Sequence, residues 1–391
     1  MSSVIRKIAT DKTFLITLFL AIIAFIFGHV TVEDIDLKTI LSLLSLIIIV
    51  SVYEQLHVLK YIANTVVIKC RSTRDIIRVM LLFSFVGSML FTNDVAILTL
   101  VPIFLKISQQ VAIKKIVPIS LLTIYANLGS ALTPFGNPQN LYLVSFYHLS
   151  LPTFLGMSIP LGLIGLISLF AVSFLFPAKP IDNILTDSVS LDHHKVWWLI
   201  LATVIVLLGI LSFIAIWWSL LASVLSAFLL DKQVLQQVDY GIILTFINFF
   251  IIVGAVSRID IIHQLLVATT QTQFHAFFAA IISSQFVSNV PAAVLLSKFT
   301  DHFYGIYLGV TVGGLGTLIA SLANLLALRQ YNIFSQDRTS VTFFKTFTWL
   351  NLIYLIIFVI IGSLIFYQKS SVSMHLASFY DAAIGHQALL K

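Results

Sequence analysis

Apolar runs long enough to cross a lipid bilayer recur along the chain, and short polar segments separate them. A membrane-spanning helix needs about 20 consecutive apolar residues, so the pattern predicts an all-α polytopic membrane protein with about nine to eleven transmembrane segments. A further stretch, residues 54–73, is amphipathic and is expected to lie at the membrane surface. The expected spans are residues 13–30, 37–53, 116–147, 151–176, 196–213, 216–230, 240–257, 304–328 and 344–367.

Two more apolar segments are expected to be re-entrant hairpins, which enter and leave the membrane on one face. Residues 76–105 are too many for one span and too few for two, and basic residues flank both ends of the segment. Residues 274–296 are the second candidate hairpin. The longest polar connection lies near the middle of the chain and divides it into halves. The predicted organisation is an N-terminal membrane repeat at 1–176, a polar connecting loop at 177–194, a C-terminal inverted membrane repeat at 195–367 and a polar tail at 368–391.

The two halves carry matching motifs. Each hairpin turns at a hydroxyl residue followed by asparagine, and each precedes a span that glycine or proline interrupts. Unwound backbone inside a membrane must line a cavity or pack against protein. Broken helices at matching positions of inverted halves therefore indicate the binding site of a secondary transporter. The matching pairs are Thr92 and Ser288, Asn93 and Asn289, Thr133 and Thr317, Asn137 and Ser321, and Asn140 and Asn324.

The composition excludes a water-soluble protein. Hydrophobic residues make up 59% of the chain and charged residues only 10%, whereas soluble domains carry about a quarter charged residues. The net charge of +6 does not indicate nucleic-acid binding, because basic residues scattered among apolar runs chiefly set orientation. When the N-terminus is placed on the inner side of the cell membrane and the hairpins on opposite faces, most Lys and Arg residues lie on the inner side. We expect the first span to be retained rather than removed as a signal peptide.

Asp94 is the one acidic residue deep inside an apolar segment. A charge at that depth costs about 2.5–3.5 kcal/mol, so its default interpretation is functional. An aspartate that only caps a helix is the alternative, and the same alternative holds for Asn93 and Asn289. Pro134 and Gly136 keep the first broken span from closing into a continuous helix. We therefore expect Asp94 to be a coupling group and Gly136 to border a cavity.

These motifs resemble those of the ion transporter superfamily, which groups arsenite-efflux permeases, citrate transporters, divalent anion/sodium symporters and some sodium/proton antiporters. The resemblance rests on residues 91–102 (FTNDVAILTLVP), 126–140, 288–296 (SNVPAAVLL) and 317–325 (TLIASLANL). It implies an elevator-type carrier that holds substrate and coupling ion between two hairpin tips and two unwound loops. The site residues that it implies are Thr92, Asn93, Asp94, Thr133, Gly136, Asn137, Asn140, Ser288, Asn289, Thr317, Ser321 and Asn324, with Na⁺ near Asn93, Asp94 and Asn137.

The hairpin tips depart from the dicarboxylate branch of this superfamily, in which both tips read Ser-Asn-Thr. Here they read Thr-Asn-Asp and Ser-Asn-Val, which disfavours sodium/dicarboxylate symport and brings in a proton carried by Asp94. The sequence leads to the hypothesis of an ion-coupled secondary active transporter for a small anion or oxyanion, such as a di- or tricarboxylate or arsenite. No cofactor is expected beyond a coupling ion, H⁺ or Na⁺. The expected partners are that solute, the cation and the lipid bilayer, without nucleic acid, and the resemblance suggests a homodimer.

Other functions stay open at this stage. A sodium/proton antiporter of the same fold is the main alternative, and a passive channel is another. An intramembrane enzyme, such as an aspartyl protease or a polyprenyl-linked transferase, is a rival class, but the aspartyl mechanism needs two carboxylates in one site and only Asp94 is deep. A nucleoside-triphosphate-driven pump is disfavoured because the chain has no G-x-x-x-x-G-K-[ST] run. We therefore expect that the protein is not an enzyme.

Overall fold

The computed structural model describes residues 3–111, 113–181, 190–335 and 339–388, and within those ranges its regular elements are helices, with no strand. The all-α polytopic fold predicted from the sequence is confirmed. The predicted connecting loop at 177–194 lies partly outside the described residues, at 182–189, and so do the ends of the predicted first repeat and tail, at 1–2 and 389–391. Side chains are described as far as Tyr367.

The helices of the first half follow the predicted apolar runs. Several of them begin at a side-chain cap, such as Asp36 or Ser150, whose oxygen accepts a hydrogen bond from a backbone amide of the first turn. The elements are α1 (Ser3–Thr10), α2 (Lys12–Phe27), the 3-10 turn η1 (Val32–Asp34), α3 (Leu37–Gln55), α4 (Val58–Val67), α5 (Thr73–Phe91), α6 (Asn93–Gln110), α7 (Ile116–Ser130), α8 (Pro138–Phe146) and α9 (Leu151–Ser173).

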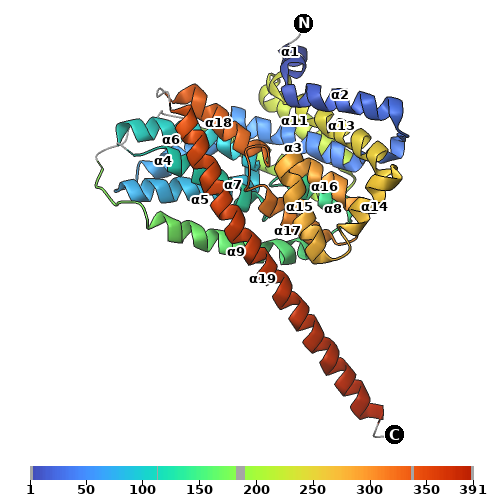
Figure 1. The fold of residues 1–391 in the computed structure, drawn as a ribbon. Coiled ribbons are helices and arrows are strands. Elements are labelled where there is room, and N and C mark those ends of the chain that lie inside the picture. The colour runs from blue at the N-terminus through green and yellow to red at the C-terminus, as the bar shows by residue number, and fades with distance from the viewer. Residues whose placement is uncertain (1–2, 112, 182–189, 336–338, 389–391) are drawn as a thin grey trace.

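The second half begins at α10, which starts inside the predicted polar loop because Asp192 caps it. Its last helix, α19, continues through much of the predicted polar tail and extends away from the other helices in Figure 1. The elements are α10 (His193–Ile210), α11 (Ile216–Asp231), α12 (Val234–Gln237), α13 (Tyr240–Ser257), α14 (Asp260–Ala268), α15 (Gln273–Val287), α16 (Asn289–Ser297), α17 (Phe303–Gly313), α18 (Leu322–Phe334) and α19 (Ser340–Ala388).

Membrane-spanning character is clear in the described part of the chain. Five helices are long and apolar enough to cross a membrane, or six if α14 and α15, bent by 119°, count as one span. Five shorter apolar helices, among them α7 and α17, belong to the broken or short segments. These helices make the protein an integral, multi-pass membrane protein. The number of nine to eleven spans stays a prediction.

The first hairpin is longer than the sequence indicates. We expected its apolar segment at 76–105, but α5 begins at Thr73 and α6 ends at Gln110. Tertiary contacts stabilise the polar start of α5: the Arg74 Nε donates to the Phe176 carbonyl at 2.7 Å, and the Arg78 Nε donates to the Ser173 hydroxyl at 2.9 Å. Partners about 100 residues away cannot be seen in local hydropathy, so the helix start was misplaced.

Segments of the two halves pack against each other at the centre of the molecule. Within each half, the first arm of the hairpin packs on the helix that precedes the break, α5 on α7 and α15 on α17. The helix after each break crosses to the other half, so that α18 packs on α6 and α8 packs on α16. Figure 1 shows α5, α6 and α18 on one side of the molecule and α2 and α13 on the other. The broken segments therefore lie where the halves meet.

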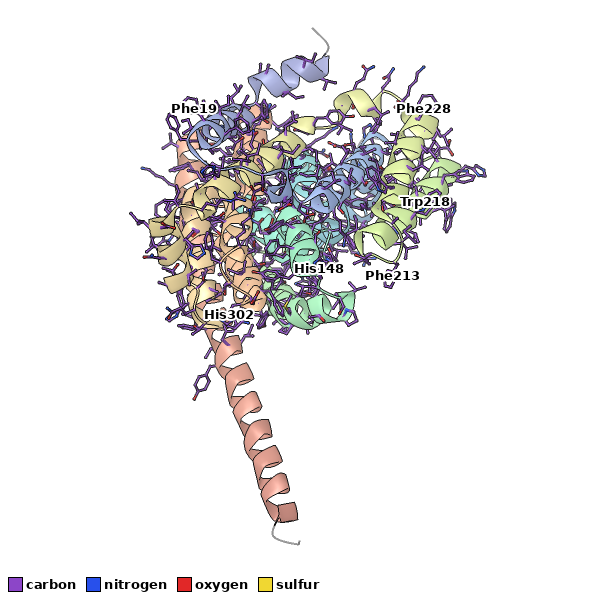
Figure 2. The ribbon with its side chains drawn as sticks, turned by 90° about the vertical axis from the view of Figure 1, so that its right-hand side faces the viewer. Phe19, His148, Phe213, Trp218, Phe228 and His302 are labelled. Carbon is purple, nitrogen blue, oxygen red and sulfur yellow. The ribbon has the colours of Figure 1, made fainter. Side chains whose placement is uncertain are left out.

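The outer surface is apolar and carries aromatic side chains. Trp197 and Trp198 near the start of α10 are 70% and 68% exposed, and Trp217 and Trp218 near the start of α11 are each 59% exposed. Figure 2 shows Trp218 on the outer surface, as it does Phe19. Tryptophan is enriched at membrane–water boundaries. These exposed rings are therefore expected to face lipid or its headgroup region.

An ion cluster around the buried Asp34 ties the loop between α2 and α3 to two distant helix ends. The Asp34 carboxylate accepts from both terminal nitrogens of Arg258, at 2.9 and 3.1 Å, and from the Lys298 ammonium at 3.1 Å. Burial alone would raise the pKa of Asp34, but hydrogen bonds from Arg258, the Thr31 backbone and Lys298 outweigh it and hold that pKa well below its usual range. The cluster's stabilisation is therefore present above the ordinary pKa of aspartate and is lost only as pH falls through the lowered one.

Candidate functional site

Each hairpin turns at a single residue in an uncommon backbone conformation. Thr92 separates α5 from α6 with φ 72° and ψ 153°, and Ser288 separates α15 from α16 with φ 75° and ψ 156°. Residues other than glycine rarely adopt a positive φ, and such backbone strain persists only where the surrounding structure enforces it. Both predicted tips therefore adopt the same uncommon backbone conformation, which the surrounding structure must stabilise.

Each tip is held by the broken segment that follows it in the chain. The backbone amide of Asn93 donates to the Gly136 carbonyl at 3.2 Å, and that of Asn289 donates to the Ala320 carbonyl at 2.9 Å. The Ser288 hydroxyl also donates to the Ala320 carbonyl, at 3.4 Å. The halves therefore use the same backbone contact between tip and loop.

Two threonines fasten the loops to the first arms of the hairpins. The Thr133 hydroxyl donates to the Met89 carbonyl at 2.7 Å, and the Thr317 hydroxyl donates to the Gln285 carbonyl at 3.1 Å. Met89 and Gln285 occupy the same place, three residues before the tip. Thr133 and Thr317, paired from sequence alone, thus make equivalent contacts.

The side chains of two asparagines donate hydrogen bonds to backbone carbonyls at the two breaks. The Asn140 amide donates to the carbonyls of Ser130, at 3.3 Å, and Thr133, at 3.0 Å. Its counterpart Asn324 donates to the carbonyls of Gly314, at 3.0 Å, and Thr317, at 2.9 Å. A buried carbonyl without a donor costs about 1–3 kcal/mol, so these amides stabilise the unwound loops.

The helix after the first break begins as the Asn-Pro sequence predicts. The Asn137 side-chain oxygen accepts from the backbone N–H of Asn140 at 2.9 Å, and Pro138 occupies the first turn of α8. The Asn137 amide donates to the Ser130 hydroxyl at 3.0 Å. Both polar groups of Asn137 therefore shape the loop. The break itself starts after Ser130, where α7 ends.

Asn127, in the last turn of α7, joins the two halves through four hydrogen bonds. Its side-chain oxygen accepts from the Asn93 amide at 2.9 Å and from the Ser321 hydroxyl at 3.0 Å. Its own amide donates to the side-chain oxygen of Asn324 at 3.0 Å and to the Gly314 carbonyl at 3.4 Å. All these side chains are buried. We call this set of five residues the Asn127 junction.

Sequence reasoning did not place Asn127 in the site, although it lies in the motif at 126–140. The available signal was a carboxamide inside an otherwise apolar helix, where a polar group requires a partner. Of the predicted residues, the junction directly joins Asn93, Ser321 and Asn324. Thr133, Thr317, Asn137, Asn140 and Gly136 shape the loops around it, while Thr92, Ser288 and Asn289 form the tips.

Asp94 lies in the first turn of α6, next to the junction along the chain. Its backbone amide donates to the Asn93 side-chain oxygen at 3.0 Å. Its carboxylate oxygen Oδ1 is buried and has no hydrogen-bond partner. A helix N-terminus favours a negative charge, but only modestly. In the described residues no group of three His, Cys, Asp or Glu side chains is arranged to hold a metal ion. Any cation at Asp94 would therefore need ligands of another kind.

A family model described as "Citrate transporter" matches residues 2–304 of the chain. The protein belongs to the citrate transporter family. An uncharacterized transporter of Methanocaldococcus jannaschii is 35% identical over 76% of this chain and 82% of its own length. The inner membrane protein YbiR of Escherichia coli is 28% identical over 76% of this chain and 81% of its own. Among solved structures, the YdaH transporter of Alcanivorax borkumensis matches with a TM-score of 0.49 at 12% identity, over 84% of this chain and 85% of its own.

Membership of the citrate transporter family confirms several expectations from the sequence. The resemblance to citrate- and arsenite-type permeases is confirmed, and the protein is a membrane transporter, not an enzyme. A small solute and the lipid bilayer are therefore its partners.

Gly136 gives a direct test of the loop geometry in this citrate transporter family member. A Cβ there would lie 2.2 Å from the Ser130 carbonyl oxygen, so we expect Gly136→Ala to displace the loop and cut transport at least about tenfold. Transport and thermal unfolding of the purified protein check this. Gly156→Ala in α9 is the matched control, because a Cβ there meets nothing within 4 Å. Equal behaviour of the two variants would contradict the tight packing of the Gly136 loop.

Proposed function

We propose that the protein is an ion-coupled secondary active transporter that moves a small anion or oxyanion, of the di- or tricarboxylate or arsenite-like class, across the cell membrane. The observation that carries the proposal is the Asn127 junction, where one hairpin tip and both broken segments are joined by buried hydrogen bonds. A transporter must bind its solute where its two halves can rearrange around it.

The electrostatics around the junction favour an anion. Four helices, α6, α8, α16 and α18, begin at the tips and after the breaks. Each helix N-terminus carries a positive partial charge, which suits carboxylate or oxyanion groups. None of the junction residues is a lysine or arginine, so amides and hydroxyls would supply recognition.

Coupling is assigned to Asp94. Its buried, unpartnered carboxylate oxygen would be neutralised by a proton or would join a Na⁺ site with Asn93 and Asn137. The same observation favours a sodium/proton antiporter as a second candidate, because an antiporter needs a titratable carboxylate and no anion.

The elevator movement, the orientation in the membrane and the oligomeric state are part of the same proposal. The matching contacts of the two halves support an inverted repeat and an elevator-type movement of the hairpins. Basic residues at the ends of α4 to α6 support a cytoplasmic location of that face, with the N-terminus inside. The proposed assembly is a homodimer, which chemical cross-linking in membranes would detect.

Transport assays in proteoliposomes test the function. Citrate, succinate, arsenite and sulfate are offered under an imposed proton or sodium gradient. We expect gradient-driven accumulation of at least one anion, with saturable counterflow that a passive channel would not give. If no anion accumulates while a sodium gradient moves protons, the antiporter replaces this proposal. If no solute or ion moves in a protein that is folded, both are wrong.

A further inference from the structure

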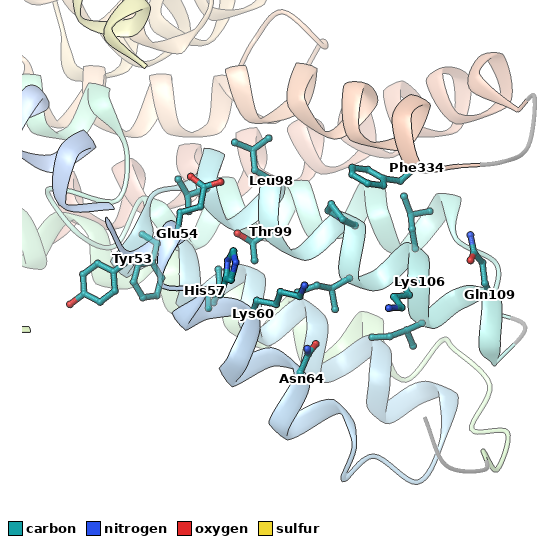
Figure 3. Close-up of a pocket in the computed structure, with 17 residues that line it drawn as sticks. Tyr53, Glu54, His57, Lys60, Asn64, Leu98, Thr99, Lys106, Gln109 and Phe334 are labelled. Carbon is teal, nitrogen blue, oxygen red and sulfur yellow. The ribbon is translucent and has the colours of Figure 1, made fainter. Parts of the chain in front are cut away.

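A cavity of about 650 Å³ lies apart from the Asn127 junction, between the ends of α3 and α18 and the helices α4 and α6 (Figure 3). Its volume is within the range of about 300–1,000 Å³ that small-molecule sites occupy. No junction residue belongs to its described lining. It is therefore distinct from the junction, and the function proposed above does not assign it.

The cavity wall is basic and polar on two sides. Lys60 from α4 and Lys106 from α6 border the same space, as Figure 3 shows, and Asn64 and Gln109 line it from the same two helices. Glu54 contributes the one carboxylate of the described lining. With two ammonium groups against one carboxylate, the lining carries a net positive charge. The N-terminus of α4, next to His57, adds a positive partial charge.

The cavity also reaches the first hairpin tip. Phe91 and Val95, which line it, stand on either side of the tip residues Thr92, Asn93 and Asp94. Thr99, Pro102 and Lys106 continue the lining along α6 toward its end, where Phe334 of α18 also lines the cavity. The end of α3 lies beside the tip instead, where the rings of Tyr53 and Phe91 are in contact. The lining thus runs from the basic face of the protein, which we assign to the cytoplasm, to the neighbourhood of Asp94.

We propose that this cavity is the cytoplasmic vestibule of the carrier and holds a di- or tricarboxylate between Lys60 and Lys106 before it reaches the junction. The inference rests on the proposed anion transport. Two ammonium groups on different helices suit an anion with two or more carboxylates, because each can take a separate charge-assisted hydrogen bond. Focusing an anion in a basic cleft also raises its local concentration and its rate of capture.

Occupancy is tested by cysteine protection, which does not depend on transport. Leu98→Cys, at the cavity wall, is introduced together with Cys70→Ser into the full chain, in nanodiscs of neutral phosphatidylcholine. We expect citrate and succinate to slow maleimide labelling of the new thiol, and chloride at equal ionic strength to have no effect. Lys60→Gln combined with Lys106→Gln should abolish the protection. Lys69→Gln is the matched control, because Lys69 is exposed beside α4 and does not line the cavity.

Flux measurements then separate this inference from the proposed function. With cytoplasmic-side substrate, the double lysine variant should raise the apparent KM about tenfold and leave the maximal rate nearly unchanged. Protection without transport of any anion would support the cavity as a binding site but overturn the proposed function. Transport without protection, or with an unchanged KM in the double variant, would overturn the vestibule. So would protection that appears only with anionic phosphatidylglycerol, which would assign the lysines to a lipid headgroup.

Discussion

Replacing Asn127 with leucine is expected to reduce gradient-driven transport by at least about a hundredfold. The change leaves the Asn93 amide, the Ser321 hydroxyl and the Asn324 oxygen without their buried partner. Each unsatisfied group costs about 1–3 kcal/mol, and together they would separate the hairpin tip from the second loop. Initial rates of uptake in proteoliposomes, normalised to the amount of folded protein, measure the loss.

Asn351→Leu provides the matched control for the Asn127 experiment. Asn351 is equally buried in a helix, but its amide donates only to the Phe347 carbonyl of its own helix, at 2.9 Å. We expect this variant to keep transport within about threefold of wild type, since the hydrogen bond that it removes lies within one helix. Wild-type uptake by a well-folded Asn127→Leu variant would show that the junction is not part of the transport site.

Asp94→Asn is expected to uncouple transport from its ion gradient. Asparagine keeps the size of the side chain but has no negative charge to bind a cation or accept a proton. Concentrative uptake should therefore fall at least about tenfold, while exchange of solute at equal concentrations should persist. Parallel measurements of gradient-driven uptake and counterflow distinguish the two.

Asp260→Asn is a suitable control for Asp94. Asp260 also lies in the first turn of a helix, α14, but it is exposed. Its substitution should leave both kinds of flux unchanged. Asp94→Glu, which keeps the carboxylate, should retain part of the coupling. Undiminished gradient-driven uptake in Asp94→Asn would remove Asp94 from the coupling mechanism and leave the hairpin as a passive part of the binding site.

Hydropathy and turn residues were sufficient to predict much of the fold. The predicted span at 240–257 has the bounds of α13, and both predicted hairpins turn at the expected positions, Thr92 and Ser288. These features were accessible because membrane helices and their breaks are dictated by local apolar runs, proline and glycine. The pairing of Thr133 with Thr317 came from the same local motifs, and their equivalent contacts agree with it.

The central contacts were not accessible from the sequence, because they join residues far apart in the chain. Asn127 and Asn324 are 197 positions apart, and no local pattern indicates that their side chains meet. The start of α5 was misplaced for a similar reason, since Arg74 depends on a carbonyl 102 residues away. Lys60 and Lys106 counted only as orientation signals until the structure placed them around one cavity.

The central claim is that the two hairpins enter the protein from opposite faces of the membrane, and that the first hairpin tip meets both broken segments at the Asn127 junction. Gln110, at the base of the first hairpin, and Gln271, at the base of the second, are both exposed. Each is replaced by cysteine in a Cys70→Ser background and labelled in sealed vesicles with a membrane-impermeant maleimide. We predict that the thiol of Gln271→Cys is labelled from the extracellular side, whereas the thiol of Gln110→Cys reacts only from the cytoplasmic side. Labelling of both positions from the same side would contradict the inverted arrangement and the carrier built on it.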